Sequence, residues 1–220
     1  MGKFVEIRLF LDLKDLKIIA FTHKTTDISN VGKLHIDVEN RETRLKKLKG
    51  SEISELMYLS TCNRVEFTII TEKELTKGYL TRFFSRFSED WDENDVNWAI
   101  ENCTVFQGEE SVKHIFHTAS SLDSLVIGER EIITQVRKAF DECSEYGFTG
   151  PILQLLINKT IESAKEVYTK TQIAKNPISI VSLAYRKLRE LGIKDNSRII
   201  VIGAGETNTR MCKFLSKHGL

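Results

Sequence analysis

The hydrophobic pattern of this chain changes its period partway along, and that change limits the folds open to it. In the first half, runs rich in β-branched and aromatic residues predict strands over 16–22, 65–71 and, briefly, 105–106. From Glu110 on, apolar residues recur every three to four positions, which is the spacing of a helix. Helices are predicted over 38–49, 75–87, 111–119, 129–146, 151–171 and 177–191. The first 16 residues alternate loosely, as in an edge strand or an arm.

The chain closes on a strand–glycine–helix unit. Ile199–Gly205 reads IIVIGAG and runs directly into a polar helix start. Glycines let phosphates approach the backbone and a helix N-terminus attracts their charge, so Gly203–Asn208 is a candidate nucleotide loop. One strand and one helix cannot cover both faces of a parallel sheet, so we expect the unit to open a larger domain. The predicted class is α/β, with an α+β domain over 1–171, then a connector helix and the truncated start of a Rossmann-like domain over 172–220.

The charge balance and the ends of the chain exclude several classes of protein. Lys and Arg number 32 against 31 Asp and Glu, a formal net charge of +1, so no global electrostatic argument favours nucleic-acid binding. No apolar run reaches the roughly 18 residues of a membrane span. The charged N-terminus lacks the apolar stretch of a signal peptide. We therefore expect a cytoplasmic protein.

The four cysteines are widely spaced, so the sequence predicts neither a disulfide framework nor a metal site. Cys103, Cys143 and Cys212 are expected to be structural. Cys62 differs because it lies in the heptapeptide STCNRVE, residues 60–66, where polar residues crowd between two apolar segments. A positive neighbour favours the reactive thiolate, and Arg64 is two residues away. The alternative, an inert cysteine at a strand end, is less consistent with this crowding.

A second polar segment runs from Ala119 to Glu131, with Gln135 on the following helix. Its serines and aspartate predict a turn, and Gly128 lets the backbone turn again before the helix. Glu129 and Glu131 fall in the first turn of that helix, where carboxylates suit the helix dipole. Taken alone, the segment is best interpreted as a loop with helix-capping residues.

Together, and in this order, these segments resemble the glutamyl-tRNA reductase family, from about residue 18 to the end. Phe21-Thr22-His23-Lys24-Thr25 is similar to the family's Asn-His-Lys-Thr start. The heptapeptide 60–66 matches one family signature, and LDSLVIGE, residues 122–129, matches another. GAGET, residues 203–207, matches the cofactor loop.

The resemblance implies a reaction. Cys62 would attack the ester that joins glutamate to its tRNA, and the resulting thioester would be reduced by NADPH to glutamate-1-semialdehyde, the first step of five-carbon tetrapyrrole synthesis. The substrate-binding positions implied are Thr61, Asn63, Arg64, Ser124, Glu129, Arg130, Glu131 and Gln135. The cofactor-binding positions implied are Gly203, Ala204, Gly205, Glu206, Thr207 and Asn208.

The resemblance also implies partners and limits. Beyond glutamyl-tRNA(Glu), the family suggests a homodimer in the full-length protein and transfer of the aldehyde to glutamate-1-semialdehyde aminomutase. With only part of the cofactor site present, we expect this chain to be limited to acyl transfer or ester hydrolysis. His114 matches a helix position and is expected to be structural, and His23 is a candidate proton carrier.

Two alternatives stay open. The family usually has a histidine where this chain has Phe106, and Pro-Gln where it has Arg130-Glu131, and these departures motivate the alternative of a non-catalytic relative that binds charged tRNA or a regulatory partner. An unrelated NAD(P) dehydrogenase would leave the Cys62 motif as coincidence. The basic run of residues 41–49 could contact tRNA phosphates, but a solvated helix face is the preferred interpretation. The residues of that run are Arg41, Arg44, Lys46, Lys47 and Lys49.

Overall fold

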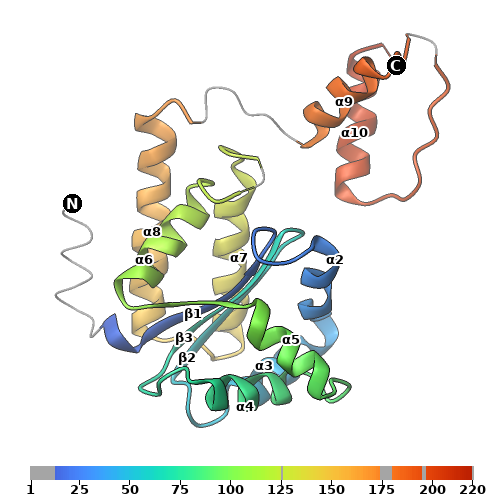
Figure 1. The fold of residues 1–220 in the computed structure, drawn as a ribbon. Helices are drawn as coiled ribbons and strands as arrows, with labels where there is room; N and C mark the ends of the chain where they lie inside the picture. Colours follow the sequence, from blue (N-terminus) through green and yellow to red (C-terminus); the bar gives the residue numbers. More distant parts are fainter. Residues whose placement is uncertain (1–12, 125, 174–179, 195–196, 220) are drawn as a thin grey trace.

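A four-stranded antiparallel sheet forms the centre of the molecule. The computed structural model describes residues 13–124, 126–173, 180–194 and 197–219. The strands are β1 (Leu16–Thr22), β2 (Glu55–Ser60), β3 (Arg64–Ile70) and β4 (Thr104–Gln107), in the spatial order β2-β3-β1-β4 (Figure 1). In the register, Ile18 lies opposite Thr68 of β3 and Phe106 of β4.

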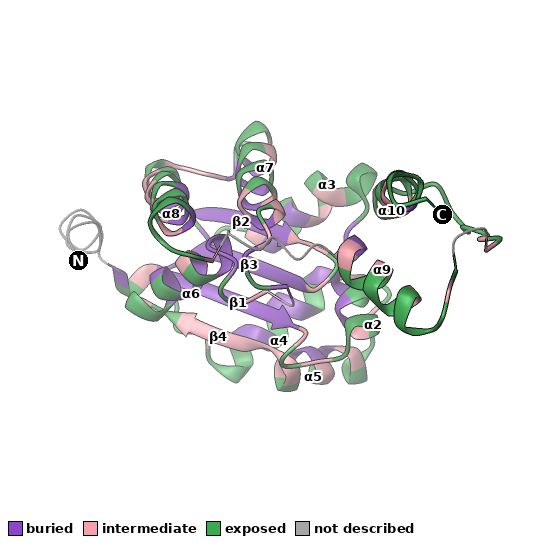
Figure 2. Cartoon of the chain, turned by 90° about the horizontal axis from the view of Figure 1, so that it is seen from above, coloured by how far each residue is buried: buried purple, intermediate pink, exposed green. Residues whose placement is uncertain are grey.

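Helices cover both faces of this sheet, and its central strands β1 and β3 are therefore buried along their whole length (Figure 2). Successive side chains of a strand point to opposite faces. Accordingly, Ile19 and Phe21 of β1 pack in one core, and Ile18 and Ala20 pack in the other. The first core is covered by α3 (Val38–Lys49), α4 (Lys77–Phe87) and α5 (Glu93–Asn102), and the second by α6 (Glu109–Ala119), α7 (Glu131–Glu145) and α8 (Pro151–Lys170).

The remaining elements are shorter or lie beyond the sheet. Leu13–Asp15 forms a 3-10 turn before β1, and α2 (Ile28–Val31) continues into another over Gly32–Leu34. Toward the C-terminus, α9 (Ile180–Glu190) and α10 (Glu206–Lys217) contact each other through the rings of Tyr185 and Phe214, whose centroids are 5.3 Å apart. Within the described part of the chain, no helix has both the length and the apolar character required to cross a membrane.

A buried carboxylate joins the sheet to α8. Glu55 is 6% exposed, and its carboxylate accepts hydrogen bonds from the backbone N–H groups of Gly150 (3.0 Å), Ile152 (3.1 Å) and Leu153 (2.8 Å). The first N–H groups of a helix have no partner within the helix, and negative charge is favoured there. Glu55 therefore fixes where α8 begins relative to β2.

The sequence predicted most of these elements. The strands over 16–22 and 65–71 are confirmed as β1 and β3, and the mixed α/β class is confirmed. The short strand predicted at 105–106 lies within β4, and no strand was predicted for β2. Two expectations, the arm or edge strand over the first 16 residues and the start of the helix predicted over 177–191, fall largely or wholly outside the described residues.

The predicted strand over 199–202 is not formed, and this expectation is wrong for the structure. Ile200 is 88% exposed and Ile202 is 90% exposed, so neither is buried. A parallel strand is stabilised by hydrogen bonds to neighbours and by cover on both faces. No described segment pairs with residues 199–202 in the sheet of this chain.

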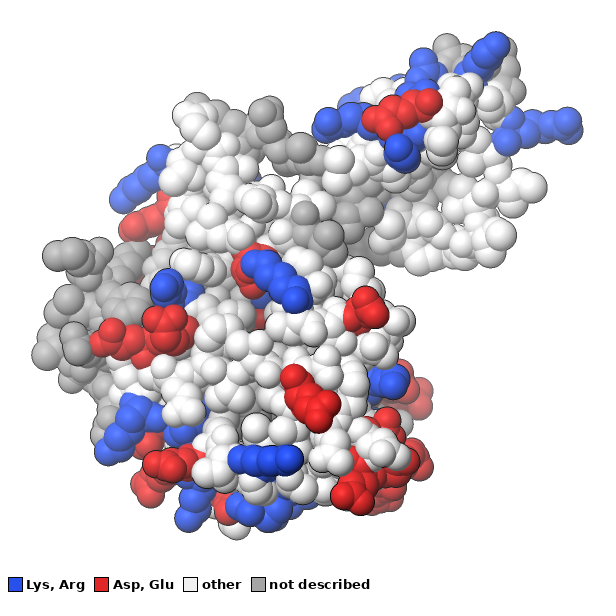
Figure 3. Space-filling model, in the orientation of Figure 1, with Lys and Arg blue, Asp and Glu red and all other residues white. Residues whose placement is uncertain are grey.

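Two residues of the basic run of α3 are used inside the molecule. Arg41 donates two hydrogen bonds to the carboxylate of Glu142 (2.9 and 2.8 Å), and Arg44 donates to the backbone oxygen of Phe87. Lys47 pairs with Glu89. Figure 3 shows acidic and basic side chains interspersed over the face it presents. Arg41 and Arg44 are therefore structural, in line with the preference against tRNA contact.

Candidate active site

Cys62 lies at the tip of the hairpin formed by β2 and β3. The Thr61 N–H donates to the backbone oxygen of Arg64 (2.9 Å), and the Asn63 N–H donates to the Thr61 hydroxyl (3.2 Å). The backbone oxygen of Asn63 accepts from the N–H of His23 in the loop after β1 (3.1 Å). These bonds satisfy the backbone of the turn locally and leave the Cys62 side chain exposed.

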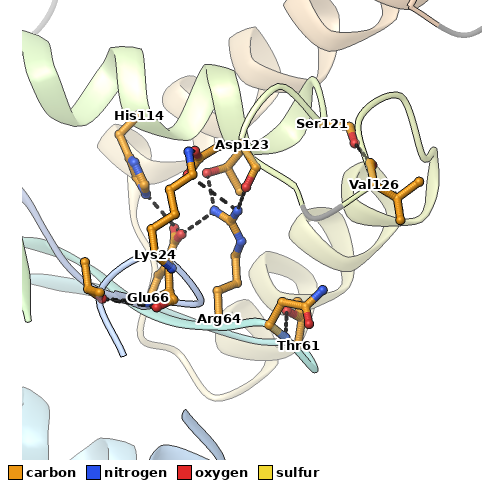
Figure 4. Close-up of polar contacts among 12 residues, drawn as sticks. Lys24, Thr61, Arg64, Glu66, His114, Ser121, Asp123 and Val126 are labelled. Atoms are coloured by element: carbon orange, nitrogen blue, oxygen red, sulfur yellow. Dashed lines mark hydrogen bonds and ion pairs between the residues drawn. The ribbon is translucent and has the colours of Figure 1, made fainter. Parts of the chain in front are cut away.

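Behind the hairpin, Arg64 is the centre of a buried polar cluster (Figure 4). Its side chain is 2% exposed, and its guanidinium donates to Glu66 Oε1 (2.7 Å) and to the Thr118 hydroxyl (2.7 Å). It also contacts the backbone oxygen of Asp123, whose carboxylate lies 3.6 Å away. The same Glu66 oxygen lies 3.0 Å from His114 Nε2. The cluster thus connects β3 to α6 and to the loop that follows it.

The charges of this cluster are balanced internally. Burial by itself raises the pKa of Glu66, but the charges and hydrogen bonds of His114 and Arg64 outweigh it and hold that pKa below its ordinary value. His114 was expected to be structural, and it is buried with its ring stacked on Phe106 at 4.1 Å. The sequence did not reveal that His114 is linked to Arg64 through Glu66. Residues 64 and 66 share one strand face, which was the available signal.

Arg64 does not activate the Cys62 thiol, contrary to the expectation from the sequence. Burial raises the pKa of Cys62 above its ordinary value, a backbone hydrogen bond opposes this, and the charge of Glu129 raises it further. The Arg64 guanidinium is committed to Glu66, Thr118 and Asp123. These effects disfavour the thiolate form of Cys62 in this state.

The second polar segment folds into a tight loop between α6 and α7. Ser121 has a positive φ of 57°, and its hydroxyl donates to the Val126 backbone oxygen (3.1 Å) and accepts from the Gly128 N–H (3.1 Å). Gly128 also has a positive φ, of 88°, and a β-carbon there would collide with the backbone oxygen of Ile173. A non-glycine residue held at positive φ is an uncommon and strained feature that often lies beside a functional site.

The hairpin and this loop enclose one small cavity of about 50 Å³. It is lined by Thr61, Cys62, Asn63, Arg64, Ser124, Val126, Glu129, Glu131, Ile132 and Gln135. The structure thereby brings together all of the predicted catalytic and substrate-binding positions except one. That one, Arg130, is exposed, and its guanidinium lies over the ring of Tyr168, 5.6 Å from its centroid. Val126 and Ile132 were not predicted, because apolar residues carry no signal of a site.

The other cysteines and His23 lie away from this cavity. Burial raises the pKa of Cys103 and of Cys143 to about 11, so both are unreactive thiols. Cys212, expected to be structural, is exposed on α10. The Nδ1 atom of His23 is buried with no hydrogen-bond partner among the described residues. Burial, and then the charge of Arg64, lowers the pKa of His23. Its role as a proton carrier stays a prediction.

The glycine loop before α10 has the features that a phosphate group requires. Gly203 has a φ of +98°, and a β-carbon at Gly205 would meet no atom within 4 Å. Gly205 is the N-cap of α10 and brings no capping side chain to the first N–H groups of the helix. Asn208 donates to the backbone oxygens of Ile202 (2.8 Å) and Gly203 (3.2 Å), which closes the loop. The residues present therefore fit the phosphates of a dinucleotide.

Comparison with known proteins places this chain in a family. The family model for the N-terminal domain of glutamyl-tRNAGlu reductase matches residues 19–171. The glutamyl-tRNA reductase of Campylobacter hominis is 37% identical over 205 residues, which cover 91% of this chain and 47% of that protein. That of Campylobacter curvus is 36% identical with the same coverage.

A solved structure has the same fold. Glutamyl-tRNA reductase from Methanopyrus kandleri is similar with a TM-score of 0.64 and 27% identity, over 94% of this chain and 48% of that one. The chain thus spans about half the length of the curated relatives it matches. On the family model and these relatives, the chain belongs to the glutamyl-tRNA reductase family.

Proposed function

We propose that this chain is the acyl-accepting part of an NADPH-dependent glutamyl-tRNA reductase. Cys62 is the nucleophile that takes the glutamyl group from glutamyl-tRNA(Glu). The observation that carries the proposal is the Cys62 cavity, in which two segments about 60 residues apart in sequence bring a thiol together with Thr61, Asn63, Ser124 and other polar side chains. Family membership supports the same reaction.

The electrostatics of the cavity suit a glutamyl group, which carries one ammonium and one carboxylate. Glu129 lines the wall opposite the hairpin and is the group that would receive the ammonium, because the neighbouring Glu131 is ion-paired with Arg210. Burial raises the pKa of Glu129, and the charge of Arg210 opposes that rise. Because the charge of Glu129 raises the pKa of Cys62, a substrate ammonium placed against Glu129 would offset that charge and favour the thiolate.

Attack forms the bond between the Cys62 sulfur and the acyl carbon, and the ester bond to the tRNA ribose breaks. The thiol proton leaves with the ribose oxygen, so the step is balanced without another reactant. NADPH held by the glycine loop, residues 203–208, would supply the hydride that reduces the thioester to glutamate-1-semialdehyde. In the full-length protein we propose the division inferred above, a catalytic domain over 1–171 followed by the cofactor-binding unit, together with the homodimer and the aminomutase partner.

At about 50 Å³ the cavity is well below the roughly 300–1,000 Å³ that ligand sites commonly have. A glutamyl group is larger than this cavity, so acylation requires the loop carrying Ser124 and Glu129 to move outward. That loop is the side of the site with strained backbone, at Ser121, whereas the Arg64 side is fixed in the core.

The test is intact-mass analysis of the chain mixed with glutamyl-tRNA(Glu), beside a Cys62→Ser control. A glutamyl adduct on the native chain alone supports the proposal. Deacylation of the tRNA that is lost in the control also supports it, since water then hydrolyses the thioester. If a folded chain gives neither an adduct nor deacylation, the proposal is overturned. A relative that only binds charged tRNA is then favoured.

A further inference from the structure

Cys62 borders a second cavity on the other side of the hairpin tip. This cavity, called here the α2 groove, has a volume of about 410 Å³. It is lined by Ile28, Val31, Gly32, His35, Ser60, Thr61 and Cys62. Thr61 and Cys62 are common to both cavities, so the reactive thiol stands between a small polar cavity and a larger groove. Figure 1 shows α2 beside the ends of the strands that carry this loop.

The chemistry of the α2 groove differs from that of the small cavity. None of its lining residues, all within the described part of the chain, is Lys, Arg, Asp or Glu. Ile28 is 51% exposed and offers a free apolar surface, while Val31 is buried behind it. At the end nearest Cys62, His35 Nδ1 lies 3.0 Å from the Ser60 hydroxyl. An apolar wall with a small set of polar groups suits a flat, neutral ring that carries hydroxyl groups.

We propose that the α2 groove binds the 3′-terminal adenosine of the charged tRNA during acyl transfer, with the base against Ile28 and the ribose near His35 and Ser60. This inference rests on the proposed function, because it assigns the leaving half of the same ester. When a thiol attacks an ester, the acyl group and the alcohol occupy different sides of the attacked carbon. A nucleophile between two cavities accommodates both, and the polar cavity takes the glutamyl group.

The groove has the dimensions for this occupant. Ligand sites commonly have volumes of about 300–1,000 Å³, and at about 410 Å³ the groove is in that range. The lack of a cation among its lining residues argues against a phosphate group and for the nucleoside itself. Packing a base against an aliphatic side chain buries apolar surface and does not depend on charge.

Gly32 provides the sharpest test, because it lines the groove and has room for a side chain. Its φ of −58° is helical, and a β-carbon there would meet no atom within 4 Å. Gly32→Leu therefore narrows the groove without displacing backbone. Ile28→Ala removes the proposed base platform, and its matched control is Val38→Ala, an exposed apolar residue (68%) on α3 that lines neither cavity.

The experiment compares two esters of glutamate with one acyl group and different alcohols, using the 220-residue chain. One is 2′(3′)-O-glutamyl-adenosine, and the other is the trifluoroethyl ester, whose alcohol has an acidity close to that of a ribose hydroxyl. Acylation of Cys62 is followed by intact mass. We expect the adenosine ester to react faster by about tenfold, the scale of burying part of one aliphatic side chain. Gly32→Leu and Ile28→Ala should lose this advantage and keep the trifluoroethyl rate, whereas Val38→Ala keeps both.

Each other outcome decides between explanations. Equal rates for the two esters on the native chain, or equal slowing of both by Gly32→Leu, would overturn the adenosine site while leaving the acyl transfer intact. No acylation by either ester would instead overturn the proposed function. If Gly32→Leu leaves both acylation rates unchanged and weakens NADPH binding, the groove belongs to the cofactor and the proposal is wrong.

Discussion

Replacing Glu66 should destabilise the fold, because this carboxylate compensates a buried guanidinium. Glu66→Ala removes the contact with Arg64 Nη1 (2.7 Å) and the one with His114 (3.0 Å). Removing one partner of a buried ion pair costs about 3–5 kcal/mol. Thr118 and Asp123 still contact Arg64, so we expect a loss near the lower limit, about 3 kcal/mol. Glu66→Gln keeps the shape and one acceptor but loses the charge, and should cost about 1–2 kcal/mol.

The assay is urea unfolding at pH 7, followed by far-ultraviolet circular dichroism. The pKa of Glu66 is lower in the folded chain than its ordinary value of about 4.3. Its contribution is therefore fully present above that ordinary value and is lost as the pH falls toward the lower folded value. The difference between the native chain and Glu66→Gln should shrink over that range. Replacing both partners, as Arg64→Met with Glu66→Leu, should cost less than the sum of the single changes. A loss under about 1 kcal/mol for Glu66→Ala, or simple additivity of the pair, would refute this reasoning.

Three further predictions follow from other contacts. Glu55→Gln leaves one carbonyl oxygen for three helix N–H groups, so the free energy of unfolding should fall by about 1–3 kcal/mol. The urea midpoint should fall with it, and an unchanged midpoint would show that α8 does not depend on this cap. Gly128→Ala places a β-carbon against the backbone oxygen of Ile173 at a residue with positive φ. The free energy of unfolding in urea should fall by about 1–3 kcal/mol, and no change would mean that the loop relaxes freely. Glu129→Gln removes a charge that raises the pKa of Cys62, so the pH midpoint of Cys62 alkylation by iodoacetamide should move down. An unchanged midpoint would contradict the electrostatic coupling between Glu129 and Cys62.

The sequence predicted elements that depend on local pattern and did not predict those that depend on distant partners. β1 and β3 follow from runs of β-branched and aromatic residues, and α7 follows from apolar spacing. α5 was not predicted, although Asp92 and Asp95 form a capping box that marks its start. In that acidic stretch the helix is held by Val96 and Ala99 on one narrow face, which is a weak periodic signal.

The site shows the same division. The family resemblance, carried by two short segments that are each continuous in sequence, predicted most of the side chains that line the Cys62 cavity. Their protonation could not be predicted, since it depends on burial and on charges from elsewhere in the fold. In the sequence, Arg64 lies two residues from Cys62, and nothing near it indicates another partner for its guanidinium. Its partners Thr118 and Asp123 are more than 50 residues away, and only the folded sheet brings them together.

The two walls of the Cys62 cavity differ in how closely ligand binding is coupled to the stability of the fold. Arg64 is at once a wall of the cavity and part of the core, so a substitution there alters binding and stability together. On the opposite wall, Ser124, Glu129 and Gln135 line the cavity but are only half-buried, so substitutions of these side chains alter binding with smaller effects on stability. Exchanging them therefore tests binding separately from folding. Arg130-Glu131, one of the points at which this chain departs from the usual family sequence, lies on this side.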